Sequence, residues 1–188
     1  MINNDYLVDT EWCDSGGYCD TMPIRNHPNL VFKSFKTKSR AESSYKNQKK
    51  LSKLNLAPDI FSALCKVPYY FDPELLKYWS PDQTTTDWGF VTEKAELLEE
   101  DCKIPYKKIQ DLVDNIRIQT KLKFWDCHLS NIGYIKRGRK KLLVCIDTGN
   151  ESFTSYTNAW GFEEPGPKCP YCNRYQCYCS TIYDEEQE

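Results

Sequence analysis

The sequence predicts an α+β protein made of two small lobes and a cysteine-rich end. Strand, turn, strand, helix and strand patterns follow one another up to about Glu93, and a helix with one apolar stripe begins near Ile104. A short aliphatic run at residues 142–146 predicts a buried strand, and four cysteines crowd together near the carboxyl end. These patterns divide the chain into three segments, residues 1–95, 96–162 and 163–188.

Composition and charge are those of an ordinary globular protein. Hydrophobic residues make up 40% of the 188 residues, charged residues make up 28%, and the formal net charge is -2. That charge gives no general field for nucleic acid, although residues 46–53 and 136–141 are locally basic and are interpreted as solvated surface. The amino-terminal residues do not resemble a signal peptide, and no apolar run is long enough for a membrane helix. We therefore expect a cytoplasmic protein that does not bind membranes, and the charge disfavours nucleic acid as a partner.

The first lobe is expected to hold a small antiparallel sheet and one helix. In the predicted strand at residues 30–35, the two-residue period puts Lys33 on the same face as Val31. A helix opens near Glu42 and runs to about Leu54. Further strands are expected near residues 6–11, 18–24 and 88–95.

Gly16 and Gly17 lie between the first two of these strands. Glycine allows backbone amides to approach a phosphate closely, so this turn could cover a nucleotide. A plain hairpin turn explains the same two residues.

The second lobe is expected to be built on one amphipathic helix. Pro105 suits its first turn, and the apolar residues that come after it recur at helical spacing. We predict that this stripe faces the core; its members are Ile109, Leu112, Val113, Ile116 and Thr120.

Three polar residues flank the aliphatic run at 142–146. Asp126 and Asn131 precede it, and Asp147 comes directly after it. Phosphoryl transfer depends on positioning and on cations that neutralise spreading negative charge. A carboxylate must lie near the acceptor hydroxyl, while magnesium accepts a few protein oxygens and keeps phosphate and water in its other positions. The spacing therefore predicts a magnesium-dependent phosphotransfer site.

The pattern Asp-x-His-x-x-Asn-x-Gly from Asp126, followed by Ile-Asp-x-Gly from Ile146, resembles the catalytic and metal-binding loops of the protein-kinase-like superfamily. It is closer to the atypical and aminoglycoside-phosphotransferase-like branch than to ordinary eukaryotic kinases. The resemblance implies a bilobal fold with a small antiparallel-sheet N-lobe, a reduced helical C-lobe and a cysteine-rich knob. It also implies ATP and Mg²⁺ as cofactors, Asp126 as the catalytic base, and Asn131 and Asp147 as metal ligands.

The same resemblance implies roles for residues of the first lobe. Lys33 would bind the nucleotide phosphates, with Val31 part of the floor beneath the adenine ring, and Glu42 would pair with Lys33. The stretch from Ser39 to Glu42 is also a Ser-x-x-Glu capping box, in which Glu42 would satisfy the start of the helix instead. Backbone groups at the hinge could hydrogen-bond the adenine; these hinge residues are Glu93, Lys94 and Ala95.

The cysteines near the carboxyl end have the pattern Cys-x2-Cys-x4-Cys-x-Cys. Four thiolates this close together could bind one tetrahedral zinc ion. A site completed by Cys13 or Cys19 is an alternative, and so are disulfides, which the absence of a secretion signal disfavours. The scattered cysteines, such as Cys127 and Cys145, are interpreted as small packing residues. The candidate zinc ligands are Cys169, Cys172, Cys177 and Cys179.

The segment after Asp147 departs from an ordinary protein kinase, because about forty residues remain where a kinase builds its activation segment and peptide-docking helices. Compact kinase-like chains of this kind resemble those of viral genomes, which would place the protein in the host cytoplasm. Two functions stay open: a small atypical protein kinase acting on an unknown hydroxyl, and a catalytically weak or inactive pseudokinase module that binds another protein. A nucleic-acid-binding zinc knuckle is a third, with Tyr171 and Tyr175 able to stack on bases.

Overall fold

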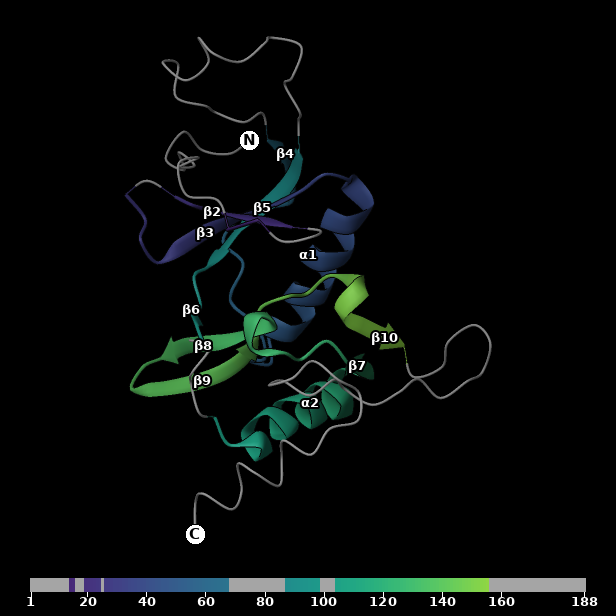
Figure 1. Cartoon of the computed structure of the whole chain (residues 1–188). Coiled ribbons are helices and arrows are strands. Elements are labelled where there is room, and N and C mark those ends of the chain that lie inside the picture. The colour runs from purple at the N-terminus through teal and green to yellow at the C-terminus, as the bar shows by residue number, and fades with distance from the viewer. Residues whose placement is uncertain (1–13, 16–18, 25, 68–86, 99–103, 156–188) are drawn as a thin grey trace. The chain divides into compact units, whose positions relative to one another are not determined.

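In a computed structural model of the chain, the structure describes residues 14–15, 19–24, 26–67, 87–98 and 104–155. Over these ranges the protein is α+β, with two α-helices and small antiparallel sheets (Figure 1).

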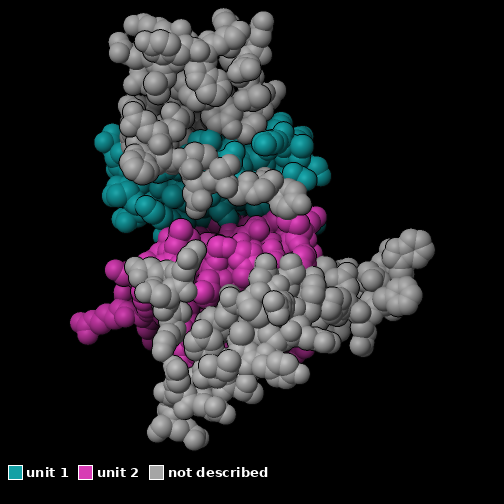
Figure 2. All heavy atoms as spheres, viewed as in Figure 1, with its two compact units in different colours: residues 1–46, 59–94 teal, residues 47–58, 95–188 magenta. Residues whose placement is uncertain are grey.

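The chain forms two compact units (Figure 2). Unit 1 contains Met1–Lys46 and Asp59–Lys94, and unit 2 contains Asn47–Pro58 and Ala95–Glu188. The chain therefore passes between units beside the boundary expected at residue 95. It also does so twice earlier, which the sequence did not suggest.

Unit 1 is organised by an antiparallel sheet in which β3 is central. Strand β3 occupies Leu30–Phe35, the residues predicted for it, and the side chains of Phe32 and Phe35 enter two different apolar clusters. Gly89 on the neighbouring strand admits the ring of Phe32, because a Cβ at that position would overlap the ring. The strand order is β1 (Asp14–Ser15), β2 (Asp20–Pro23), β3, β5 (Asp87–Glu93) and β4 (Cys65–Val67).

Helix α1 spans Lys38–Ser52 and begins on a different cap from the one considered above. The Arg40 amide donates to the hydroxyl of Thr37 at 3.4 Å, so Thr37 caps the helix and the Ser39–Glu42 capping box is wrong. The helix ends two residues earlier than expected, before a turn in which Asn55 adopts a positive φ of 56°. Its buried face carries both apolar and polar side chains, Ala41, Ser44, Gln48 and Leu51.

Helix α2 spans Tyr106–Thr120 and is the scaffold of unit 2. Pro105 stands at the N-cap rather than inside the first turn, and Lys121 ends the helix in the left-handed conformation. Neither of the α-helices in the described part of the chain has an apolar stretch long enough to cross a membrane. All five residues of the predicted stripe are buried: Ile109, Leu112, Val113, Ile116 and Thr120.

Two antiparallel sheets complete the described part of unit 2. Strand β7 (Leu122–Phe124) pairs with β10 (Phe153–Ser155), and β8 (Ile132–Arg137) lies between β6 (Glu96–Leu97) and β9 (Lys140–Cys145). The expected strand at 142–146 is thus β9, which begins earlier and ends one residue sooner. Strand β8 was not predicted.

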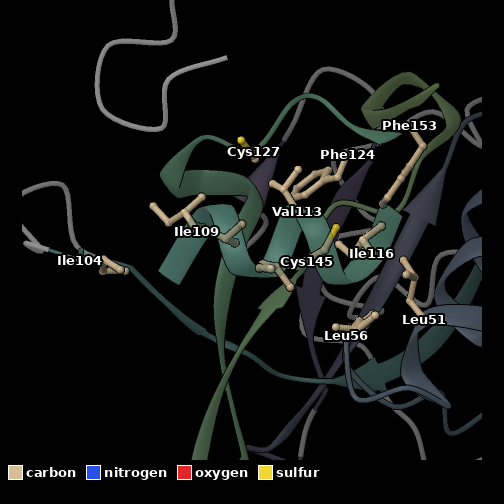
Figure 3. Close-up of a cluster of buried hydrophobic side chains, with 13 residues drawn as sticks. Leu51, Leu56, Ile104, Ile109, Val113, Ile116, Phe124, Cys127, Cys145 and Phe153 are labelled. Carbon is tan, nitrogen blue, oxygen red and sulfur yellow. The ribbon is translucent and has the colours of Figure 1, made fainter. Parts of the chain in front are cut away.

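The core of unit 2 joins segments that are distant in sequence (Figure 3). The rings of Phe124 and Phe153 stack with centroids 5.2 Å apart. Leu51, at the end of α1, and Ile116 of α2 are fully buried in the same cluster. Burying such side chains stabilises the fold by about 1.5–3 kcal/mol each, so the strand ends around this core are firmly held.

Candidate active site

Asp126 lies in a loop that is anchored in the core of unit 2 on both sides. The loop leaves β7 after Phe124 and enters a short 3-10 helix, η3, at Leu129–Asn131. Phe124 and Cys127, which flank Asp126, are buried, whereas the side chain of Asp126 remains 22% exposed. The local sequence therefore presents one carboxylate at the surface between two apolar anchors.

Asn131 holds Asp126 through its side-chain amide. Its Nδ2 group donates to the main-chain oxygen of Asp126 at 2.9 Å and to the carboxylate Oδ2 at 3.0 Å. Within the described part of the chain, the Oδ1 atom of Asn131 accepts no hydrogen bond. The amide nitrogen is thus committed to the loop that carries Asp126, and within the described residues its oxygen is available to a ligand.

His128 braces this loop. Its Nε2 lies 2.9 Å from Asn131 Nδ2, and its Nδ1 lies 2.6 Å from the Ser130 hydroxyl. A neutral ring protonated on Nδ1 is compatible with both contacts, because Asn131 Nδ2 can only donate; the two N–H groups of Asn131 are then shared among three acceptors. Nε2 is also 3.7 Å from Asp126 Oδ1.

Asp147 is oriented by hydrogen bonds to both of its carboxylate oxygens. The Gly149 amide donates to Oδ1 at 3.1 Å, and the buried hydroxyl of Ser152 donates to Oδ2 at 2.7 Å. The Cys145 thiol donates to the main-chain oxygen of Asp147 at 2.8 Å. Each carboxylate oxygen can still use its second lone pair.

The end of the β8–β9 ladder brings Asn131 and Asp147 together. The last pair of the ladder is Ile132 with Cys145, and beyond it the Ile146 amide donates to the Asn131 carbonyl at 2.9 Å. The Asp147 amide approaches the same carbonyl at 3.5 Å. Two candidate ligands sixteen residues apart in sequence are therefore neighbours through their backbones.

The loop after Asp147 is tied to the end of α1 by side chains that the sequence analysis missed. The Asn47 amide donates to the Thr148 carbonyl at 3.1 Å and to Asn150 Oδ1 at 3.2 Å. Gln48, fully buried, accepts from the Thr148 hydroxyl at 3.2 Å and donates to the Pro58 carbonyl at 3.1 Å. A glutamine on the buried face of a helix was the available signal, because such an amide must find partners.

The donor set suits a hard cation. The oxygens of Asn131 and Asp147 can supply two ligands, and Mg²⁺ typically completes its octahedron with phosphate oxygens and water. Among the described residues, no three side chains of His, Cys, Asp or Glu are grouped in a way that could hold a metal ion. A magnesium ion here would therefore depend on the nucleotide for much of its coordination.

Cys127 beside the catalytic loop is a packing residue. Burial raises the pKa of its thiol to about 12. The thiol is therefore neutral at physiological pH and is a poor nucleophile.

Lys33, the residue expected to bind phosphate, lies in unit 1, as do Val31 of the expected adenine floor and Glu42, its expected partner. Val31 and Lys33 are both buried on β3, and Lys33 is opposite Phe90 of β5. Glu42 is 54% exposed, and its carboxylate lies 3.5 Å from Lys38, one helical turn earlier. A pair between Glu42 and Lys33 would require Glu42 to leave Lys38.

The hinge segment already uses two of its amides. The Glu93 amide donates to the Asp59 carbonyl at 2.8 Å, and the Lys94 amide donates to the Asn29 carbonyl at 2.8 Å. These two donors are therefore committed to unit 1, and adenine recognition at the hinge would have to use carbonyl groups or Ala95.

Some predicted site residues lie outside the described residues, namely Gly16, Gly17, Cys169, Cys172, Cys177 and Cys179. Comparison with models of known protein families and with curated proteins finds no match for this chain.

Proposed function

We propose that this protein is an ATP- and magnesium-dependent phosphotransferase of the protein-kinase-like superfamily, acting as a small atypical protein kinase. Unit 1 corresponds to its N-lobe and unit 2 to a reduced C-lobe. The observation that supports this most directly is the shared geometry of Asp126, Asn131 and Asp147. One amide orients the Asp126 carboxylate, and the same residue meets Asp147 at the end of a β-ladder.

The chemistry assigned to unit 2 follows from these positions. Asp126, partly exposed and held by Asn131, would accept the proton of an acceptor hydroxyl as its oxygen attacks the terminal phosphorus and the bond to the nucleoside diphosphate breaks. Asn131 Oδ1 and the Asp147 carboxylate would hold Mg²⁺, which supplies positive charge to the phosphate oxygens. The Asp147 carboxylate is preorganised for this by Gly149 and Ser152.

Lys33 is the residue of unit 1 to which we assign nucleotide binding. It is a lysine with only 8% exposure in the middle of a strand, and lysine is rarely buried to this extent. Val31, two residues earlier on the strand, would offer an apolar surface to the base.

The test is phosphoryl transfer and nucleotide binding by the full chain with magnesium. Labelled ATP is incubated with wild type and with Asp126→Asn, Asn131→Ala and Asp147→Asn variants, using a generic protein acceptor and autophosphorylation as readouts. Asp111→Asn is the matched control, because Asp111 is exposed on α2 in the same unit. We expect loss of transfer in the three site variants and wild-type turnover in the control.

Measuring ATP binding and ATP turnover separately distinguishes the role of Asp147 from that of Asp126. Asp147→Asn should weaken magnesium-dependent ATP binding, whereas Asp126→Asn should leave binding intact and abolish transfer. If wild type neither binds nor turns over ATP, or if all four variants behave alike, the proposal is wrong.

The second candidate is a kinase-like module that binds another protein without turnover. It is favoured by the hinge, where the Glu93 and Lys94 amides are occupied within unit 1. A module of this kind would show no ATP-dependent rise in melting temperature. The enzyme would show a rise that requires magnesium and that Asp147→Asn abolishes.

A further inference from the structure

The turn of the β8–β9 hairpin concentrates positive charge. Residues 136–141 have the sequence Lys-Arg-Gly-Arg-Lys-Lys, so five of the six are cationic. Gly138 takes a positive φ of 61° in the turn, and the turn lies at the end of the hairpin away from α2 (Figure 1). We call residues 136–141 the basic hairpin tip.

The strand register places like charges opposite each other at this tip. Lys136 pairs with Lys141, and Arg137 pairs with Lys140. Like charges directly across an antiparallel ladder are destabilising, whereas opposite charges at the same positions would stabilise the hairpin. These two consecutive pairs of like charges destabilise the hairpin, and no evident structural gain among the described residues offsets them. Residues that lower local stability in this way are commonly found at functional sites.

Lys141 has an acidic and an aromatic neighbour in unit 2. Lys141 Nζ lies 2.6 Å from Glu96 Oε1 and 4.6 Å from the centre of the Tyr134 ring. The hydrogen bond from Lys141 lowers the pKa of Glu96, so the acid stays charged at neutral pH. In the described part of the chain, the side chains of Arg139 and Lys140 make neither a hydrogen bond nor an ion pair. The tip therefore keeps a net positive charge, and four of its five cations are exposed; Arg137 is half-buried, and its Nε donates to Asn55 Oδ1 at 3.3 Å.

We propose that the basic hairpin tip is a docking surface for an acidic protein segment. The exposed cations can pair with successive carboxylates or phosphates, and arginine can do so with two hydrogen bonds. A nucleic acid fits less well, because phosphate-backbone binding relies on many contacts spread over a basic face, whereas this patch spans six residues of a chain with a net charge of -2. This surface does not depend on the phosphotransferase activity proposed above.

The test measures binding of a fluorescein-labelled polyglutamate peptide to the full chain by fluorescence anisotropy. An R139E/K140E variant reverses the two exposed cations at the tip. A K107E/K108E variant makes the same change of charge on exposed residues of α2 and is the matched control. We expect the hairpin variant to bind the peptide about tenfold more weakly and the control to bind within about twofold of wild type. Binding should also weaken as salt rises.

Thermal melting of the variants tests whether a loss of binding is caused by misfolding. The K140E substitution places a carboxylate opposite Arg137, so the hairpin variant should melt no lower than wild type while losing affinity. Equal weakening in both variants would show a diffuse charge effect and overturn the proposal. The proposal would also be overturned if a labelled oligonucleotide bound the tip more tightly than the peptide, or if the wild-type protein bound neither probe.

Discussion

Replacing Ser152 with alanine should remove the hydrogen bond that holds the Asp147 carboxylate against the core of unit 2. The Ser152 hydroxyl is buried and donates to Oδ2 at 2.7 Å, a short bond to a charged acceptor. Such bonds contribute about 1.5–3 kcal/mol. Asp147 is only half-buried, so water can replace part of the lost interaction, and we expect a loss of about 1.5 kcal/mol in the free energy of unfolding. That corresponds to a fall in Tm of roughly 3–6 °C.

Urea denaturation of four proteins isolates this interaction: wild type, Ser152→Ala, Asp147→Asn and the double variant. If the bond is formed, the double-mutant cycle should give a coupling energy of about 0.5–3 kcal/mol. Ser130→Ala is the control, because Ser130 is exposed and its hydroxyl hydrogen-bonds, among the described residues, to the ring of His128 alone, so it should change stability by less than about 0.5 kcal/mol. Additive effects of the two substitutions, or a Ser152→Ala protein as stable as Ser130→Ala, would refute the role of Ser152.

Two other results are expected. Gly89→Ala should destabilise the protein by about 1–3 kcal/mol in urea, because the new methyl group would overlap the Phe32 ring and the Lys33 carbonyl; an unchanged midpoint would contradict the packing. The raised pKa of Cys127, about 12, means that the unfolded chain releases this proton at lower pH than the folded one. The contribution of the neutral Cys127 thiol to stability is therefore complete below the unfolded pKa and is lost as pH rises towards 12. In a plot of the free energy of unfolding against pH, Cys127→Ala should have a shallower fall at alkaline pH than wild type.

Local patterns in the sequence were sufficient for the elements whose burial repeats regularly. The stripe that begins at Ile109 predicted the buried face of α2. The bounds of β3 were predicted instead from the resemblance of residues 30–35 to a kinase-like strand, and its residues 31–35 are all buried without alternation. Periodic burial is encoded locally, so it can be recognised without knowing what covers each face.

Strand β8 escaped prediction because its signals are not local. Gly133 interrupts the apolar pattern, and the strand runs into the basic residues of the hairpin. The need for glycine at position 133 comes from the neighbouring strand, since a Cβ there would lie 2.9 Å from the carbonyl oxygen of Glu96. The start of α1 was misjudged for a related reason, because both Thr37 and Ser39 can cap a helix and only the backbone geometry chooses between them.

By itself, the sequence determined the order and spacing of Asp126, Asn131 and Asp147, together with the chemistry that their oxygens can perform. Only the tertiary structure decided how they are held: Asn131 between Asp126 and the end of a ladder, and Asp147 between Gly149 and Ser152. It also decided that Gln48, about a hundred residues away in sequence, supports the same loop. The physical reason is that hydrogen-bond partners and like-charge neighbours are set by strand register and core packing, which bring together residues that no local pattern connects.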